Sequence, residues 1–551
     1  MERSPFLRSS VSEIRLGCDG HKRLNTQYPE LLRYTDGMSL VGKVGRRRPR
    51  AIFATVVVYL LLMAGAVTTL YPFLLMVSTG FKGATDQDDN ALVPRFWFDN
   101  AELYDKYIND KYKQDLSAIA STRTGPTAPL ERIELYRKFL TDLSPLDWKA
   151  GFGLSPNQMS GRLDSLYQSW LRKRFHGDID LFDRTYIEEQ TTFDAVTTPG
   201  ELLERAQWQP QPGVRWNDWI EFKKTLPAEF RVPILAGQLY QNFIKGKYKN
   251  VFDRVPPDVR GEAKSFEQIA MPASGPLLEE FRKTMLPPRY LKETVEDKWA
   301  KVAGPGVPMP IEAYERSVLA RKEGAIKGEM SGRNFRYVLG FIALHGRALW
   351  NTALFALLTI ATQLIVNPLA AYALSRYPIR ASGRILLFLL ATMAFPAEVA
   401  MIPSFLLLKG LGLLNTFAAL VLPSAASGYM IFLLKGFFDS LPQELFEAGQ
   451  IDGARETTLM MRVAMPLSKP VLGYLALLAF MSAYGSFLYA FLIAQDQNMW
   501  TLMVYIYQLQ AASAPRALIM AALTLAALPT LIVFLLCQRV IMRGIVLPGE
   551  R

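Results

Sequence analysis

The sequence predicts an all-α polytopic membrane protein that carries one large soluble insert. Half of the 551 residues are hydrophobic, and the apolar residues concentrate in 51–79 and 348–542. Between these regions, residues 82–336 have the composition of an ordinary soluble domain. This segregation indicates one membrane domain with one insert, rather than the three or four globular domains that the length alone would suggest.

Six apolar segments are long enough, at about twenty residues each, to cross a bilayer as helices. They are roughly 51–79, 350–374, 385–408, 416–434, 471–494 and 517–541. Several contain proline or glycine, which membrane helices tolerate where neighbouring helices satisfy the freed backbone groups. Six buried core helices of a soluble protein are the less favoured alternative.

The spans divide the chain into four predicted regions. These are a basic cytoplasmic tail (1–50), a first transmembrane helix (51–81), a mostly α-helical extracytoplasmic insert (82–336), and a region with five further spans (337–545) that includes a cytoplasmic loop (437–468).

The net charge of +12 is concentrated beside the spans. Residues 81–345 hold 38 Lys and Arg against 37 Asp and Glu, so the excess lies in the tail and in short loops. A basic chain could bind nucleic acid, but charge beside apolar spans favours a topology signal, with the lipid bilayer as partner and no nucleic acid. Both termini are therefore expected in the cytoplasm and the insert outside.

The loop between the fourth and fifth spans has a pattern of its own. Ser440 and Gln443 have capping-box spacing, and the helix that follows would place a row of residues on one face. That row is Leu445, Ala448, Gly449 and Asp452. Gly453 then permits a turn, and a second short helix, about 456–464, would end before Pro466. The loop is expected to form a compact pair of short helices.

The text "EAGQIDGARETTLMMRVAMP" resembles the EAA loop of ABC-importer permeases. Glu447, Ala448, Gly453 and Pro466 fall in register with that pattern, whereas Gly449 replaces its second alanine. "IDGA", which ends at Ala454, and the flanking text 395–423 and 437–454 resemble the six-span, maltose-type carbohydrate-uptake branch. The resemblance covers 51–81 and about 334–545.

The resemblance implies the type I ABC-importer permease fold in the bacterial cytoplasmic (inner) membrane. It implies a permease subunit, not an enzyme, which moves a sugar or oligosaccharide by alternating access. A separate cytoplasmic ATPase would bind and hydrolyse ATP, so this chain would hold no cofactor; it also lacks a P-loop motif. A second permease subunit and an extracytoplasmic solute-binding protein are the other implied partners. The implied ATPase-coupling residues are Glu447, Ala448, Gly449, Asp452, Gly453, Ala454 and Pro466.

Six residues in or near the spans are candidates for the substrate path. They are Glu398, Asn351, Gln363, Asn367, Tyr484 and Tyr489. A carboxylate inside a span is costly and often functional, but Glu398 could equally cap a helix. The amides could instead form bonds between helices, and aromatic packing is an alternative to sugar stacking for the tyrosines.

The insert carries no recognisable catalytic or metal-ligand spacing, and three histidines in the whole chain make a zinc site improbable. We expect a helical domain that steadies the docking of a solute-binding protein. A ligand-sensing or glycan-binding domain and an enzymatic domain are the alternatives.

Two other functions remain open from sequence. A membrane-anchored receptor whose insert binds an extracytoplasmic partner would not need the coupling loop. An ion-coupled transporter would work without an ATPase, although few acidic residues lie within the spans.

Overall fold

The computed structural model of this 551-residue chain describes residues 49–113, 115–123, 128–153, 161–190, 193, 196–340, 347–393, 396–511 and 514–544. The chain divides into two compact units, 1–71 and 72–551. The described part of the first unit is the beginning of helix α1 (Pro49–Gly80). The predicted tail lies almost entirely outside the described residues.

Helix α1 matches the first predicted span. Within it, Thr55–Gly80 is 26 residues long with a mean hydropathy of 2.0, which is sufficient to cross a bilayer. Pro72 lies inside the helix without ending it. The second unit begins at this proline and contains the insert (82–336) and a C-terminal helical region (347–544).

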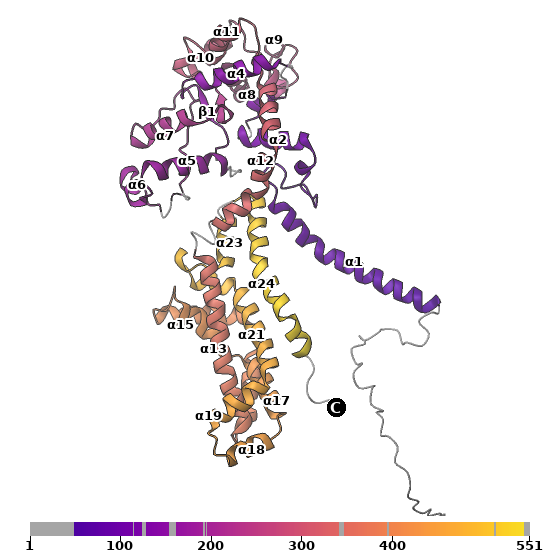
Figure 1. Ribbon diagram of the computed structural model, residues 1–551. Coiled ribbons are helices and arrows are strands. Elements are labelled where there is room, and N and C mark those ends of the chain that lie inside the picture. The colour runs from indigo at the N-terminus through magenta and orange to yellow at the C-terminus, as the bar shows by residue number, and fades with distance from the viewer. Residues whose placement is uncertain are drawn as a thin grey trace, which may run out of the picture. The chain divides into compact units, whose positions relative to one another are not determined.

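The insert is mostly helical, as predicted, with one small sheet (Figure 1). Its helices are α2 (Asn100–Lys111), α3 (Leu116–Ala120), α4 (Leu130–Asp142), α5 (Gly161–Arg174), α6 (Ile179–Tyr186), α7 (Val214–Thr225), α8 (Ala236–Lys247), α9 (Pro257–Arg260), α10 (Pro276–Thr284), α11 (Val295–Ala303) and α12 (Ile311–Leu339), with 3₁₀ turns such as η1 (Arg95–Trp97) between them. Strands β1 (Trp148–Ala150) and β2 (Arg231–Pro233) pair antiparallel, with Lys149 opposite Val232. This sheet is not predictable from the sequence, because two three-residue strands carry no periodicity.

The core of the insert encloses ion pairs as well as aromatic rings. Lys111 and Glu315 are 0% and 2% exposed, and their Nζ and Oε1 atoms are 2.5 Å apart. The hydroxyls of Tyr107 and Tyr112 also donate to Glu315, at 3.1 and 2.9 Å. Tyr107 and Lys111 belong to α2, Tyr112 directly follows it, and Glu315 belongs to α12. These contacts therefore fix α12 to the start of the insert.

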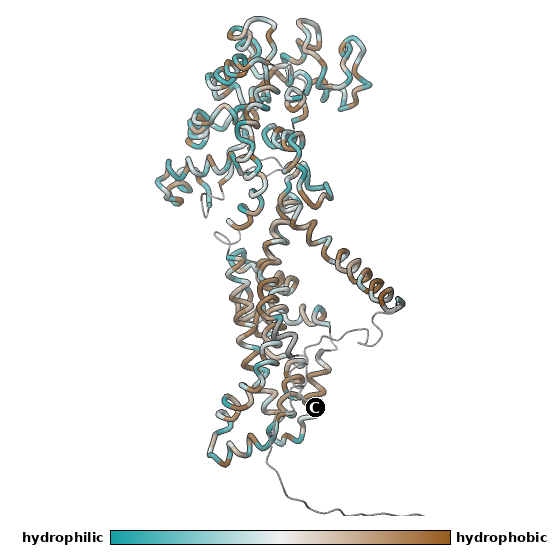
Figure 2. Tube along the Cα trace, turned by 45° about the vertical axis from the view of Figure 1, so that its right-hand side comes forward, coloured by the Kyte–Doolittle hydropathy of each residue, from teal (hydrophilic) through white to brown (hydrophobic). Residues whose placement is uncertain are grey.

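The C-terminal region consists of helices that are mainly hydrophobic, whereas polar and apolar residues alternate through the insert (Figure 2). Its helices are α13 (Ala348–Arg376), α14 (Ser382–Met393), α15 (Ala397–Gly410), α16 (Phe417–Val421), α17 (Gly428–Asp439), α18 (Glu444–Ile451), α19 (Glu456–Leu459), α20 (Met465–Leu467), α21 (Lys469–Tyr484), α22 (Leu488–Ile493), α23 (Leu502–Ala511) and α24 (Arg516–Gly544). Together with α1, α13 and α24 are long and apolar enough to span a membrane.

Three of the predicted spans are not single helices in the structure. The segment 385–408 is divided between α14 and α15, and Pro396 is the N-cap of α15. The segment 416–434 bends by 50° between α16 and α17, after a 3₁₀ turn, η8 (Leu422–Ser424), that contains Pro423. The segment 471–494 is interrupted after Tyr484, where Gly485 caps α21. Proline lacks the N–H that continues a helix, which accounts for the first two breaks.

The number of spans therefore stays a prediction. Among the described residues, three helices qualify as spans individually, and counting each of two bent pairs as one span raises the number to five. Helix α14 is apolar over Ser382–Thr392 but is too short to cross alone.

We predict that the Lys111–Glu315 pair stabilises the insert only as a pair. Glu315→Gln or Lys111→Met alone should lower the free energy of unfolding by about 3–5 kcal/mol, because each leaves its partner buried without a counter-charge. The double variant should recover much of this loss. Thermal unfolding of the full chain can be followed by tryptophan fluorescence, since seven of the nine tryptophans lie between 97 and 299. Single variants as stable as the native chain would contradict the assigned burial.

Candidate functional site

The loop that follows α17 folds as two arms, although its start differs from the prediction. Helix α18 begins at Glu444, and its N-cap residue, Gln443, makes no side-chain capping bond. Ser440 instead ends α17, and its hydroxyl donates to the carbonyl of Phe437 at 2.7 Å. The predicted capping box is therefore wrong, because α17 runs on to Asp439 and uses Ser440 at its own C-terminus.

The turn between the arms is at Gly453, as predicted. Gly453 has φ +76°, the left-handed conformation that glycine adopts without strain. The backbone N–H groups of Asp452, Gly453 and Ala454 donate to the carbonyls of Ala448, Gln450 and Gly449 at 2.9–3.0 Å. These bonds satisfy the C-terminal carbonyls of α18, so the turn is a well-closed helix end.

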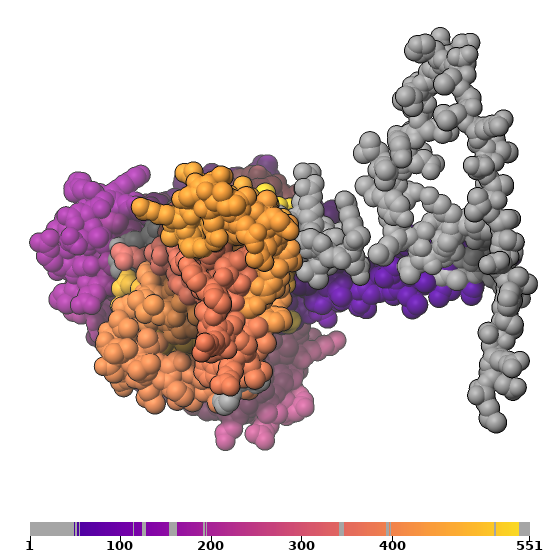
Figure 3. All heavy atoms as spheres, turned by 90° about the horizontal axis from the view of Figure 1, so that it is seen from below, coloured from indigo at the N-terminus to yellow at the C-terminus, as the bar shows by residue number. Residues whose placement is uncertain are grey.

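The outer surface of the loop is exposed and mixes acidic with apolar side chains. Glu447, Ala448 and Asp452 are exposed, and Glu447 accepts a hydrogen bond from Gln443 at 2.9 Å. Around them, Leu445, Ile451 and Met461 are 45%, 85% and 63% exposed. Figure 3 views the protein from the end that carries this loop, which appears in orange on the surface. Exposed apolar side chains flanked by carboxylates are typical of a surface that binds another protein.

Gly449 lies where the two arms meet. A Cβ atom at this position would lie 2.5 Å from Cδ2 of Leu459, which is 2% exposed. The glycine therefore permits α18 to approach the second arm closely, which is a local packing reason for glycine in place of the alanine of the EAA pattern.

The second arm is longer than predicted. A π-helical turn (Met460–Ala464) follows α19, and α20 continues to Leu467, so that Pro466 lies inside the arm. The prediction that the arm ends before Pro466 is wrong, because Pro466 occupies the first turn of α20, where proline is tolerated. The arm then bends by 81° into α21.

The three amide candidates lie along α13, and all are buried. Asn351 donates to the carbonyls of Asn498 and Trp500, at 2.8 and 3.1 Å. Gln363 donates to the carbonyl of Ser424 at 2.7 Å. Asn351 and Gln363 each donate to the backbone of a segment outside α13, so they hold that neighbouring backbone in place.

Asn367, which is 0% exposed, makes the most complete set of contacts. Its Oδ1 accepts from the N–H of Ser427 at 2.8 Å, and its Nδ2 donates to the carbonyl of Gln363 at 2.9 Å. Asn367 and Gln363 thus satisfy backbone groups on both sides of the break between α16 and α17. In the described part of the chain, the buried Gln363 Oε1 and Thr359 Oγ1 have no hydrogen-bond partner.

The other three candidates are dispersed. Tyr484 donates to the carbonyl of Ala526 in α24 at 2.5 Å, and Tyr489 donates to that of Ala419 in α16 at 2.7 Å. Glu398 is exposed in the first turn of α15. The structure does not bring the six candidates together around one cavity.

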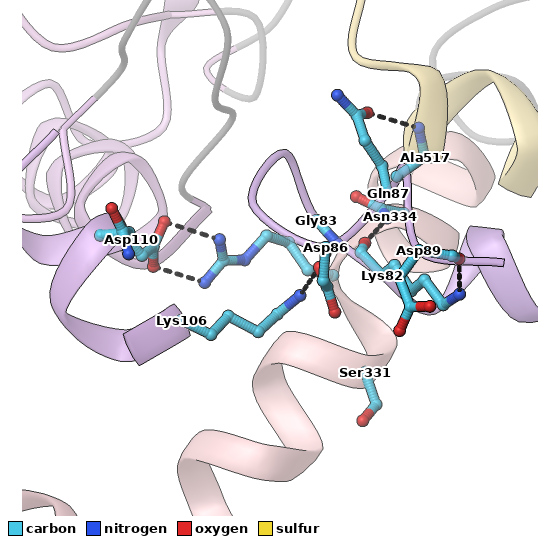
Figure 4. Close-up of polar contacts among 12 residues, drawn as sticks. Lys82, Gly83, Asp86, Gln87, Asp89, Lys106, Asp110, Ser331, Asn334 and Ala517 are labelled. Atoms are coloured by element: carbon cyan, nitrogen blue, oxygen red, sulfur yellow. Dashed lines mark hydrogen bonds and ion pairs between the residues drawn. The ribbon is translucent and has the colours of Figure 1, made fainter. Parts of the chain in front are cut away.

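Sequence reasoning missed the polar side chains that join the insert to the helices (Figure 4). Asn334 of α12 donates to the carbonyls of Gly80 and Lys82, at 3.0 and 2.7 Å. Gln87 Oε1 accepts from the N–H of Ala517 at the start of α24, at 3.2 Å. We call this network, residues 78–91 with Lys106, Asp110, 327–334 and 515–518, the joint.

Two cations of the joint are neutralised by neighbouring carboxylates, whereas buried Lys82 donates to the backbone carbonyls of Asp89 and Ala91. Lys106 lies 2.5 Å from Asp86, and Arg333 forms two bonds of 2.9 and 2.8 Å with Asp110. Burial lowers the pKa of Lys106, while Asp86 opposes that shift. A hollow of about 40 Å³ beside Lys82 and Arg333 holds a few waters at most and is too small for a sugar ring. The bonds of Asn334 and Gln87 make the joint a structural connection. A second, open hollow of about 410 Å³ lies beside its residues Asp86, Asp89 and Lys106. In the described residues, no cluster of His, Cys, Asp and Glu could hold a metal ion.

Comparison with known proteins identifies relatives of the C-terminal region. Residues 347–546 match the family model described as the inner membrane component of binding-protein-dependent transport systems. The chain is 31% identical over 198 residues to the probable ABC transporter permease protein YurM of Bacillus subtilis, covering 35% of this chain and 66%, just under two thirds, of YurM. The insert precedes the matched residues.

Two further relatives are matched over more of their length. The lactose transport system permease protein LacG of Rhizobium radiobacter is 30% identical, over 35% of this chain and 72% of LacG. The sn-glycerol-3-phosphate transport system permease protein UgpE of Brucella abortus is 31% identical, over 36% of this chain and 72% of UgpE.

Among solved structures, a bacterial ABC transporter involved in the import of the acidic polysaccharide alginate is 26% identical, over 37% of this chain and 78% of that one, with a TM-score of 0.33. Because this score is low, the assignment rests on the sequence relatives. Their coverage and identity show that the chain belongs to the family of inner membrane components of binding-protein-dependent transport systems.

Proposed function

We propose that this chain is the permease subunit of an ATP-driven importer that carries a sugar or oligosaccharide across the inner membrane. The observation that carries the proposal is the exposed two-armed loop about Gly453, in which the EAA-type spacing lies on a surface suited to protein binding. The relatives named for lactose and sn-glycerol-3-phosphate transport support the solute class.

The loop would dock in a groove of a separate cytoplasmic ATPase, which would bind and hydrolyse ATP. Helix α18 offers a docking element of suitable chemistry, because exposed Leu445 and Ile451 can enter an apolar groove. Glu447 and Asp452 can meet basic groups at the rim of that groove. Gly453 sets the angle between the arms, and Pro466 lies in the arm that returns to α21.

The remaining partners follow from the family. A binding-protein-dependent system needs an extracytoplasmic solute-binding protein, and a second permease subunit would complete the path. The topology that we propose has the loop and both termini in the cytoplasm and the insert outside. The basic residues beside the spans support this orientation.

For the substrate path, the contacts favour a division of roles. Asn351, Asn367, Tyr484 and Tyr489 bond neighbouring backbone, which supports a role between helices. Gln363, whose Oε1 lacks a partner in the described residues, is the candidate we retain for solute contact. Exposed Glu398 stays a candidate without a contact that favours it.

The joint supports a steadying role for the insert. Because it ties α12 of the insert to the end of α1, and the start of the insert to the start of α24, a protein that docks on the insert would be held at a fixed position relative to α24 and the end of α1. The alternative function, a membrane-anchored receptor, would also use the insert for binding, but it would not require the two-armed loop.

We predict that Glu447→Lys prevents stable association with the ATPase. Reversing this exposed charge should repel basic groups at the rim of the groove. Co-purification with candidate ATPase subunits measures the effect. Glu102→Lys, which makes the same charge reversal at an exposed position in the insert, is the control and should retain the ATPase. Full retention by Glu447→Lys would remove the docking role, and a native chain that retains no ATPase would favour the receptor.

We predict that Asn367→Ala lowers stability without changing the affinity for solute. The substitution leaves the N–H of Ser427 unsatisfied, which costs about 1–3 kcal/mol. Thermal unfolding of the purified chain should therefore shift downward. In an uptake assay with lactose as the probe, KM should stay near the native value. A raised KM with native stability would assign Asn367 to the substrate path instead.

A further inference from the structure

The last turn of α13 contacts both arms of the coupling loop. Tyr372 and Arg376 are four residues apart on this helix, so their side chains emerge on one face. The first arm is held by Arg376 and the second by Tyr372. The contacts of Arg376 cannot be recognised from the sequence, because its partners lie more than sixty residues further along the chain.

Arg376 stacks on a ring of the first arm and is hydrogen-bonded to α17 and to the linker between α17 and α18. Its guanidinium lies 3.7 Å from the ring centre of Phe446, a buried residue of α18. One nitrogen donates to the carbonyl of Phe438 at 2.6 Å and to that of Leu441 at 3.4 Å. A planar cation that stacks and donates at once is a property of arginine that lysine lacks.

Tyr372 is bonded to the second arm. Its hydroxyl donates to Glu456 Oε2 at 3.1 Å, and Glu456 Oε1 accepts from Gln450 of α18 at 3.2 Å. The Tyr372 ring also packs edge-to-face on Phe438, with centroids 6.0 Å apart. Glu456 therefore connects α13, α18 and α19 in one polar chain.

The same helix reaches the break between α16 and α17. Asn367 lies nine residues before Arg376, about 14 Å along the axis. Pro368 lies between them, but α13 is one helix from Ala348 to Arg376. A movement of the loop that displaces Arg376 and Tyr372 therefore reaches Asn367 and Gln363, which hold the backbone at that break.

We propose that Tyr372 and Arg376 are positioning residues that transmit movement of the coupling loop, through α13, to the break between α16 and α17. This inference rests on the proposed coupling function. The buried apolar residues Phe446, Leu459, Met460 and Ala464 already attach the loop to the region. The polar contacts of Tyr372 and Arg376 restrict the loop to one orientation, because a hydrogen bond weakens steeply when its donor and acceptor slide apart.

The test compares the native chain with Arg376→Lys and Tyr372→Phe in complex with the ATPase that co-purifies with it. Spin labels at Leu422 and Phe432, both exposed and on opposite sides of the break, report its geometry with and without ATP. Cys18 and Cys537 are first replaced by serine. Arg380→Lys, the same substitution at an exposed site just after α13, is the matched control.

We expect both variants to retain the ATPase and to hydrolyse ATP. The ATP-linked equilibrium between label distances should shift by roughly two-fold to thirty-fold toward the nucleotide-free distance. Arg380→Lys should behave as the native chain. A merely structural role would lower thermal stability while leaving the response to ATP unchanged.

An unchanged response to ATP in both variants, with the ATPase bound, would overturn the transmission role and leave the proposed function standing. If Arg376→Lys does not fold, Tyr372→Phe, which removes a single hydroxyl, decides the question. A native chain that binds no ATPase would instead remove the proposed function, and the transmission role with it.

Discussion

The hydrogen bonds that α13 makes to its neighbours are the interactions on which the C-terminal region depends. In lipid, every backbone group freed by a helix break needs a partner within the protein. The amide of Asn367 meets the N–H of Ser427, and Gln363 meets the carbonyl of Ser424. Asn351 donates to the carbonyl of Trp500, in the segment before α23. The break that follows Pro423 can exist because α13 supplies the amides of Asn367 and Gln363.

The insert and the C-terminal region solve the problem of buried polar groups differently. The insert buries whole charges in pairs, as in Lys111 with Glu315 and Lys223 with Glu201. Such pairs need further donors to repay their desolvation, and the tyrosine hydroxyls on Glu315 provide them. The C-terminal region uses neutral amides instead, whose transfer from water is less costly. The joint, which has Arg333 on Asp110, belongs to the first type.

Sequence predicted what depends on local spacing. Apolar runs predicted α1, α13 and α24, and the glycine pattern predicted the turn at Gly453. It failed where the outcome depends on distant partners. Ser440 has capping-box spacing, but α17 uses it as its end. The contact of Arg376 with Phe446 and the approach of Leu459 to Gly449 arise only once the arms have folded together. In the joint, the bond from Asn334 to Gly80 joins residues 254 positions apart.

The contacts of the loop separate attachment from transmission. Its outer residues, such as Ile451, are exposed and therefore accessible to a docking partner. Its inner residues are anchored by apolar packing, which is nondirectional and would allow α18 to slide. Arg376 and Tyr372 remove that freedom, because a stacked guanidinium and a hydroxyl–carboxylate bond each fix an orientation. Since both side chains belong to one continuous helix, a tilt of the loop becomes a displacement of α13 rather than a local rearrangement.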